Sequence, residues 1–134
     1  MKTKLAVEFE WKLVGSVHVA ASRLVFPPVS EQPGAYRFRL PDRVYVGETD
    51  RLTRRFQHYR TPGPTQTTNL RLNALLQHLL ASGAQVGVDV VTTAFVEHDG
   101  ERTELDLSHK PARLLVENTA LTIERMAGRH VENL

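Results

Sequence analysis

The sequence predicts a single α/β domain of the α+β type, with a small, mainly antiparallel sheet flanked by helices. Short segments of alternating apolar and polar residues are separated by turn residues, as expected of antiparallel strands. Other segments place their apolar residues three and four apart, which is helical spacing. With 134 residues, 41% of them hydrophobic and 24% charged, the chain suits one modest core rather than two.

Composition excludes several classes of site. The chain has no cysteine, so it has no disulfide framework, thiolate zinc site or cysteine nucleophile. Its six histidines are scattered and form no His-x-x-x-His pair. Residues 1–12 carry charges every few positions, unlike a signal peptide, and no run approaches the roughly 18 apolar residues of a membrane span. We therefore expect a soluble cytoplasmic protein without membrane association, either a monomer or a homodimer.

The first 32 residues are predicted to be an N-terminal strand and hairpin extension, and residues 33–134 the main domain. Residues 5–12 alternate in polarity as a half-buried strand does. A second apolar stretch, residues 17–26, ends at Pro27-Pro28, which cannot continue a ladder. The extension fits an added hairpin on the sheet, a dimer contact or an element of substrate specificity.

The central stretch predicts two paired strands that lead into a basic helix. Residues 35–40 alternate, Pro41 and Asp42 supply a turn, and residues 43–47 return. Thr49 or Asp50 is expected to cap a helix whose buried stripe is Leu52, Phe56 and Tyr59.

The remaining elements follow from turn residues and periodicity. A loop is expected over residues 61–68, followed by a helix over 69–80 that is capped near Thr68. A strand over 86–96 then leads through a turn at Asp99-Gly100 into a strand over 102–107. The last helix is expected to be capped by Ser108 and to run to about Met126, with Pro111 in its first turn.

Charge is unevenly distributed along the chain, although its net value is only +2. Residues 33–73 hold eight arginines and three carboxylates, whereas residues 74–134 hold nine acidic and five basic side chains. A positive field over the tyrosine–arginine stretch fits a polyanion ligand. The alternative is that these arginines only cover a solvated helix face.

Glu117 is the most informative single residue. On the last predicted helix it shares the inward stripe of Leu114, Ala120 and Leu121. An unpaired carboxylate costs roughly several kcal/mol to bury, so a partner must compensate. One alternative is a salt bridge to Arg113 or to an arginine of the first helix. The other is a Mg²⁺ or Mn²⁺ ion, which takes few protein oxygens and leaves the remaining positions to water and phosphate.

These motifs together resemble the GIY-YIG nuclease family. Gly-Ala-Tyr ends at Tyr36, Tyr-Val-Gly begins at Tyr45, Arg55 follows ten positions later, and Glu117 lies in a segment similar to the family's helical glutamate motif. The resemblance covers residues 33–134. It implies that Tyr36 is the general base and that Tyr45 positions the nucleophile or phosphate, with the reverse assignment of the two tyrosines as the alternative. It also implies that Arg55 stabilises the transition state and that Glu117 binds the metal. The base requires a lowered tyrosine pKa, which nearby arginines can provide.

Further positions follow from the same resemblance. Tyr59 occupies a position where the family has tyrosine or histidine, and His58 lies one residue away as a supporting candidate. Gly47 would let the backbone approach a bound strand. The family's C-terminal asparagine is replaced by Arg129, so Asn133 is the substitute if the chain bends after Gly128. Two further departures are Ala35, where the family has isoleucine, and Glu48, where some relatives have lysine.

The predicted function is a metal-dependent DNA endonuclease that leaves 5′-phosphate and 3′-hydroxyl ends. Predicted DNA contacts come from Arg51, Arg54, Arg60, Arg71 and the backbone at Gly47. The enzyme would be restriction-like or structure-selective. The alternatives are a non-catalytic nucleic-acid-binding module of the same fold and a nuclease acting on RNA.

Overall fold

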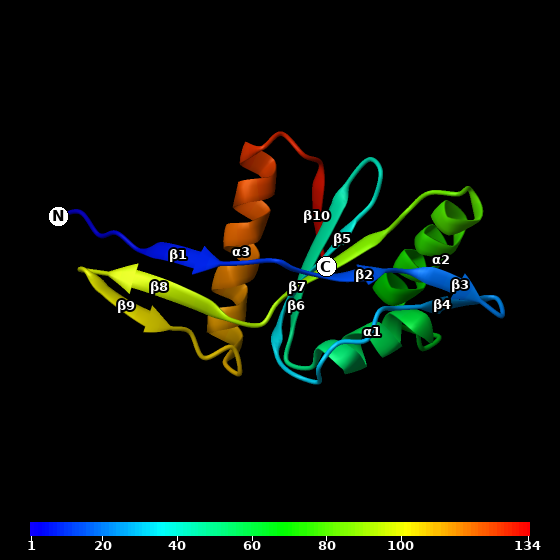
Figure 1. Ribbon diagram of the computed structural model, residues 1–134, viewed down its shortest axis with the longest axis horizontal. Helices are drawn as coiled ribbons and strands as arrows, with labels where there is room; N and C mark the ends of the chain where they lie inside the picture. Colours follow the sequence, from blue (N-terminus) through cyan, green and yellow to red (C-terminus); the bar gives the residue numbers. More distant parts are fainter.

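A five-stranded sheet forms the centre of the computed structural model, which describes all 134 residues (Figure 1). Its strand order is β10-β6-β5-β7-β2. Antiparallel pairs join β2, β7, β5 and β6, whereas β10 runs parallel to β6 at the edge. These strands are β2 (Lys12–Ser16), β5 (Gly34–Arg39), β6 (Val44–Thr49), β7 (Gly87–Val91) and β10 (Val131–Asn133).

Helices cover both faces of this sheet. The helices α1 (Leu52–Arg60) and α2 (Thr67–Ala81) lie on one face, and α3 (Lys110–Met126) lies on the other (Figure 1). Alternation along β5 sends Tyr36 and Phe38 toward α1 and α2 but Ala35 toward α3. The predicted α+β class, a mainly antiparallel sheet flanked by helices, is confirmed.

Aromatic residues dominate the core beneath α1. The rings of Phe26, Tyr36, Phe38, Phe56 and Tyr59 form one cluster, in which neighbouring ring centroids lie 5.4–6.4 Å apart. Most pairs are edge-to-face or tilted, and Phe26 and Phe56 are stacked. Site residues Tyr36 and Tyr59 are therefore held by packing as well as by their strands and helices.

A second, three-stranded sheet projects beyond α3 in the order β1-β8-β9 (Figure 1). Its strands are β1 (Ala6–Phe9), β8 (Ala94–His98) and β9 (Glu101–Glu104). The single strands predicted over residues 5–12 and 86–96 are thus each divided, because one part joins this sheet and the other joins the central sheet. The Asp99-Gly100 turn is confirmed, with φ of 50° and 80°.

The N-terminal residues belong to the same core as the rest of the chain. The hairpin of β3 (His18–Ala20) and β4 (Arg23–Val25) turns through two residues of positive φ and buries Leu24 completely. Since β2 also belongs to the central sheet, the predicted extension shares the body of the domain.

Helix starts differ from the predictions by one or two residues. Arg51, Gln66 and His109 occupy the N-cap positions of α1, α2 and α3, and none of them makes a side-chain cap. Thr49 instead accepts a hydrogen bond from the Arg51 amide at 3.1 Å. The predicted end of α3 at Met126 is confirmed, and Pro111 lies in its first turn as expected.

Arginines neutralise most buried carboxylates on the α3 side of the sheet. Asp89 is bound by Arg37 and Arg39, and Glu124 is bound by Arg37 and Arg129. The Arg37 guanidinium also lies 4.4 Å from the centroid of the Trp11 ring, a cation–π contact. This network joins β5, β7 and α3 to Trp11, which lies between β1 and β2. None of the helices has the length and apolar character needed to cross a membrane.

Candidate active site

A hydrogen bond between two buried tyrosines lies at the centre of the candidate site. The hydroxyls of Tyr36 on β5 and Tyr59 on α1 are 2.6 Å apart, and the two residues are 0% and 1% exposed. Strand alternation turns Tyr36 toward α1, and Tyr59 lies one turn after Phe56 on the buried stripe of that helix. A strand and a helix that are separated in sequence by β6 thus bring both phenols to one point.

Gly47 makes room for the Tyr36 ring. It is the direct partner of Tyr36 across the β5–β6 ladder, and a Cβ built there would lie 2.5 Å from the Tyr36 hydroxyl. The sequence interpretation, in which this glycine lets the backbone approach a bound strand, stays a prediction, and the structure adds a second reason for glycine here. The space is occupied by Tyr36.

Burial raises the pKa of Tyr36 well above its ordinary value, and the neighbouring Tyr59 adds to the rise. The positive charge of Arg55 acts in the opposite direction but does not overcome burial. Burial likewise raises the pKa of Tyr59, against the lowering effect of the Tyr36 hydrogen bond and Arg55. The expected lowering of the Tyr36 pKa is thus wrong for the protein alone, because desolvation of a fully buried phenol outweighs one nearby cation.

Arg55 is the cation that the fold directs toward this pair. It is half-buried on α1, forms no ion pair, and its guanidinium carbon lies 6.0 Å from the centroid of the Tyr59 ring. Its charge lowers the pKa of Tyr36, Tyr59 and Glu117 alike. The guanidinium N–H donors of Arg55 are therefore free of ion pairs, and its positive charge acts on Tyr36, Tyr59 and Glu117.

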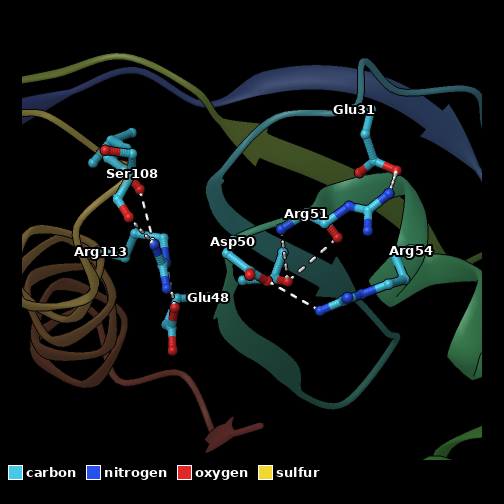
Figure 2. Close-up of polar contacts among 9 residues, drawn as sticks. Glu31, Glu48, Asp50, Arg51, Arg54, Ser108 and Arg113 are labelled. Atoms are coloured by element: carbon cyan, nitrogen blue, oxygen red, sulfur yellow. Dashed lines mark hydrogen bonds and ion pairs between the residues drawn. The ribbon is translucent and has the colours of Figure 1, made fainter.

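Glu117 is buried without a cationic partner. It is 4% exposed on α3 and forms no ion pair, unlike Asp89 and Glu124. Arg113, which the sequence offered as its salt-bridge partner, instead binds Glu48 at 2.7 Å and donates to two backbone carbonyls (Figure 2). The geometry therefore contradicts the proposed Glu117–Arg113 salt bridge.

The pKa of Glu117 is raised, first by burial and then by the nearby Glu48 carboxylate. An interaction with the Asn133 side chain and the charges of Lys110 and Arg55 partly offset this rise. Asn133 reaches this position because the chain turns at Gly128, where φ is 78°, and returns as β10 beside β6. The condition under which Asn133 was expected to replace the family's asparagine is thus met.

Tyr45 lies apart from the other candidates. Burial and a hydrogen bond with Glu132 raise its pKa, and the same bond lowers the pKa of Glu132. Glu132 faces Tyr45 across the β6–β10 ladder and is held by Arg43 and His130. The structure therefore brings Tyr36, Tyr59, Arg55 and Glu117 together but ties Tyr45 to the C-terminal strand.

The predicted DNA-binding arginines are exposed. Arg51 and Arg54 make only long contacts, 3.4 Å each, to Glu31 and Asp50 (Figure 2). Arg60 and Arg71 are exposed and form no ion pair, and His58 is half-buried on α1. Their donors are open to an anionic ligand.

The oxygen donors around Glu117 suit a hard cation held by few protein groups. No group of three or more His, Cys, Asp or Glu side chains is arranged to hold a metal ion. Glu117 and the amide oxygen of Asn133 remain, and Mg²⁺ commonly uses one or two carboxylates and completes its octahedron with water and phosphate. The site therefore fits a metal ion that is held by one carboxylate together with water and phosphate, and it does not fit an ion whose ligands all come from the protein.

Comparison of the chain with protein-family models, with curated proteins and with solved structures finds no match.

Sequence reasoning missed Glu132, Arg43 and Lys110, which act on Tyr45 and Glu117. Glu132 could not be found from the sequence because β10, the strand that carries it, has only three residues and therefore shows no recognisable periodicity.

Proposed function

We propose that this protein is a metal-dependent DNA endonuclease of the GIY-YIG type, leaving 5′-phosphate and 3′-hydroxyl ends. The observation that carries the proposal is the unpaired, buried carboxylate of Glu117 within the electrostatic reach of Arg55, Tyr36 and Tyr59. Every other carboxylate as deeply buried has arginine partners. A purely structural role for Glu117 would not explain why it alone of these buried carboxylates forms no ion pair with an arginine.

Each residue has a distinct part in the proposed reaction. Tyr36 takes the proton of the attacking water, and the charge of Arg55 favours the phenolate that this requires. Arg55 also donates to phosphate oxygens as negative charge builds on them, since its planar fork fits two oxygens at once. A bound Mg²⁺ or Mn²⁺ on Glu117 would supply Lewis-acid stabilisation of the leaving 3′ oxygen.

Partners and surroundings follow from the same proposal. DNA would approach the α1 and α2 side, where Arg51, Arg54, Arg60 and Arg71 are exposed. We propose a cytoplasmic enzyme, monomeric or homodimeric. Tyr59 supports Tyr36, His58 lies beside them on α1, and Gly47 keeps the space that Tyr36 needs.

Supercoiled plasmid provides the test. We expect the purified protein to convert it to nicked or linear DNA in Mg²⁺ but not in EDTA, with ends that a ligase can rejoin. Ends that ligase rejoins only after phosphatase and kinase treatment would contradict the proposed 5′-phosphate chemistry. Retention of plasmid without any cleavage over a range of metals would instead support the non-catalytic binding module.

A further inference from the structure

Glu48 places a second carboxylate beside Glu117 on the α3 face of the central sheet. Alternation along β6 puts Glu48 on the same face as Val46, which packs on α3, and on the opposite face from Tyr45. Arg113, one helical turn before Glu117 on α3, donates from its Nε to the Glu48 Oε2 at 2.7 Å. Side chains of a helix lean toward its N-terminus, so the Glu117 carboxylate is directed toward the turn that Glu48 contacts.

The negative charge of Glu48 acts on Glu117. Burial is the main cause of the raised pKa of Glu117, and the Glu48 carboxylate is the next. Lys110 and Arg55 lower this pKa only in part, and neither forms an ion pair with Glu117. No protein cation therefore binds both Glu48 and Glu117.

Two other buried carboxylates on the same face, Asp89 and Glu124, are neutralised together. Arg37 binds both of them, at 2.7 and 2.8 Å, so one guanidinium serves the pair. Arg113 makes no such bridge, since it binds Glu48 alone and otherwise donates to two backbone carbonyls. The carboxylates beside Arg113 are thus left to share a cation from solution.

One oxygen of Glu48 is free to act on such a cation. Arg113 binds Oε2, whereas Oε1 makes no hydrogen bond and points away from the guanidinium (Figure 2). The Glu48 side chain is 13% exposed, so water can reach it. Because Arg113 already binds half of this carboxylate, Glu48 suits a fixed hydrogen-bond acceptor better than a direct ligand. Mg²⁺ usually keeps several waters, which such acceptors orient.

We propose that Glu48 is the second carboxylate of the metal site on Glu117, acting through water, and that Arg113 holds it in place. Glu48 is thus a positioning residue that adds negative charge and a fixed acceptor next to the ion. This inference rests on the proposed function for the metal bound by Glu117. Loss of a carboxylate of this kind typically weakens metal binding by roughly 10–100-fold.

The test uses Mn²⁺ alone, without DNA, because its readout then does not depend on cleavage. Electron paramagnetic resonance measures free Mn²⁺ during a titration and gives the dissociation constant. The unfolding temperature with and without Mn²⁺ compares each variant with itself, which separates metal binding from fold stability. Glu48→Gln and Glu117→Gln are compared with Glu97→Gln, which removes one negative charge from the exposed end of β8.

We expect Glu48→Gln to weaken Mn²⁺ binding at least ~10-fold, whereas Glu97→Gln should stay within ~2-fold of the parent. The rise in unfolding temperature on adding Mn²⁺ should shrink in Glu48→Gln and vanish in Glu117→Gln. Glu48→Asp keeps a carboxylate for Arg113 and serves if the glutamine variant does not fold. It should also weaken Mn²⁺ binding, at least ~3-fold, because its carboxylate is drawn back by one methylene.

Mn²⁺ binding by both Glu48 variants at the parent's affinity would overturn this role, and so would a parent that binds no Mn²⁺. An equal loss of stability with and without Mn²⁺ would make Glu48 a structural partner of Arg113 only. Loss of Mn²⁺ binding in Glu117→Gln alone would contradict the role of Glu48 and leave the proposed function standing. Weaker binding in both variants of a protein that cuts no DNA would uphold the metal site and contradict the proposed nuclease.

Discussion

Glu117 and Glu124 lie two helical turns apart on α3, and both are buried. Glu124 is bound by Arg37 and Arg129, whereas Glu117 forms no ion pair and has a raised pKa. Desolvation is costly for any carboxylate, but only Glu124 recovers that cost from its partners. The same chemical change at the two positions should therefore have opposite effects on stability.

At pH 7 we expect Glu117→Gln to raise the free energy of unfolding by about 0.5–2 kcal/mol, the usual range of stabilising substitutions. Burial raises the folded-state pKa, so ionisation destabilises the folded state above that pKa. The advantage of glutamine should shrink as the pH falls through the raised pKa and vanish below the ordinary value of 4.5. Urea unfolding at pH 7 and pH 4 measures both effects.

Glu124→Gln is the matched control, and it should destabilise the protein by about 1.5–3 kcal/mol because it removes the carboxylate that accepts charged hydrogen bonds from Arg37 and Arg129, although Arg37 keeps its ion pair with Asp89. If Glu117→Gln destabilises the fold to a similar degree at pH 7, Glu117 has a structural partner and the functional interpretation fails.

The raised pKa of Tyr36 predicts the pH dependence of cleavage. A base must lose its proton before it acts, and below its pKa the phenolate fraction rises ~10-fold per pH unit. Since burial raises this pKa well above 10.0, the single-turnover rate should climb through pH 9 without a plateau. Tyr36→Phe should lower the rate by roughly 10²–10⁴-fold and flatten the profile. A parent plateau between pH 7 and pH 8 would assign the base to another group.

At the scale of elements, the β5–β6 hairpin and α1 depend on local patterns, and these were predictable from sequence. Alternation around Tyr36, the turn at Pro41-Asp42 and the helical spacing of Phe56 and Tyr59 each span a few residues. The division of the strands and the course of β10 were not predictable in this way, because they depend on pairing between segments far apart in sequence. For the same reason the sequence identified Tyr36, Arg55 and Glu117 as candidate residues but did not reveal that Tyr45 is bound to Glu132.

Two glycines of the central sheet offer a comparison between its faces. Gly47 faces Tyr36, and Gly87 faces the Arg39 guanidinium, each directly across a ladder. Either Gly→Ala change forces a neighbour to move and should cost about 1–3 kcal/mol. Only Gly47→Ala displaces the Tyr36 hydroxyl, so only it should abolish cleavage. Comparable cleavage by both variants at a temperature where both are folded would remove Tyr36 from the site.

Across the whole molecule, charge separates the two ends. The exposed arginines Arg60 and Arg71 lie on α1 and α2, whereas the projecting β8–β9 hairpin carries Glu97, Glu101 and Glu104 (Figure 1). This division orients an approaching polyanion toward α1 and α2, and it is consistent with the charge asymmetry seen in the sequence.

Duplex affinity should therefore depend on salt. If Arg51, Arg55, Arg60 and Arg71 each neutralise one phosphate, the logarithm of the association constant should fall with the logarithm of the salt concentration with a slope of roughly −3 to −4. Fluorescence anisotropy over a series of NaCl concentrations measures the slope. Arg71→Ala should reduce its magnitude by about 1, and a flat response in the parent would exclude this face as the binding surface.

The most direct test of the central claim compares cleavage and binding for Glu117→Gln. The substitution removes the negative charge and almost no volume, so we expect DNA affinity in Ca²⁺ to change less than ~3-fold while the single-turnover rate in Mg²⁺ falls at least ~100-fold, or about 2.7 kcal/mol. Asn118→Ala, at an exposed neighbour on the same helix, should leave both values unchanged. Cleavage by Glu117→Gln at a rate close to the parent's would contradict the account.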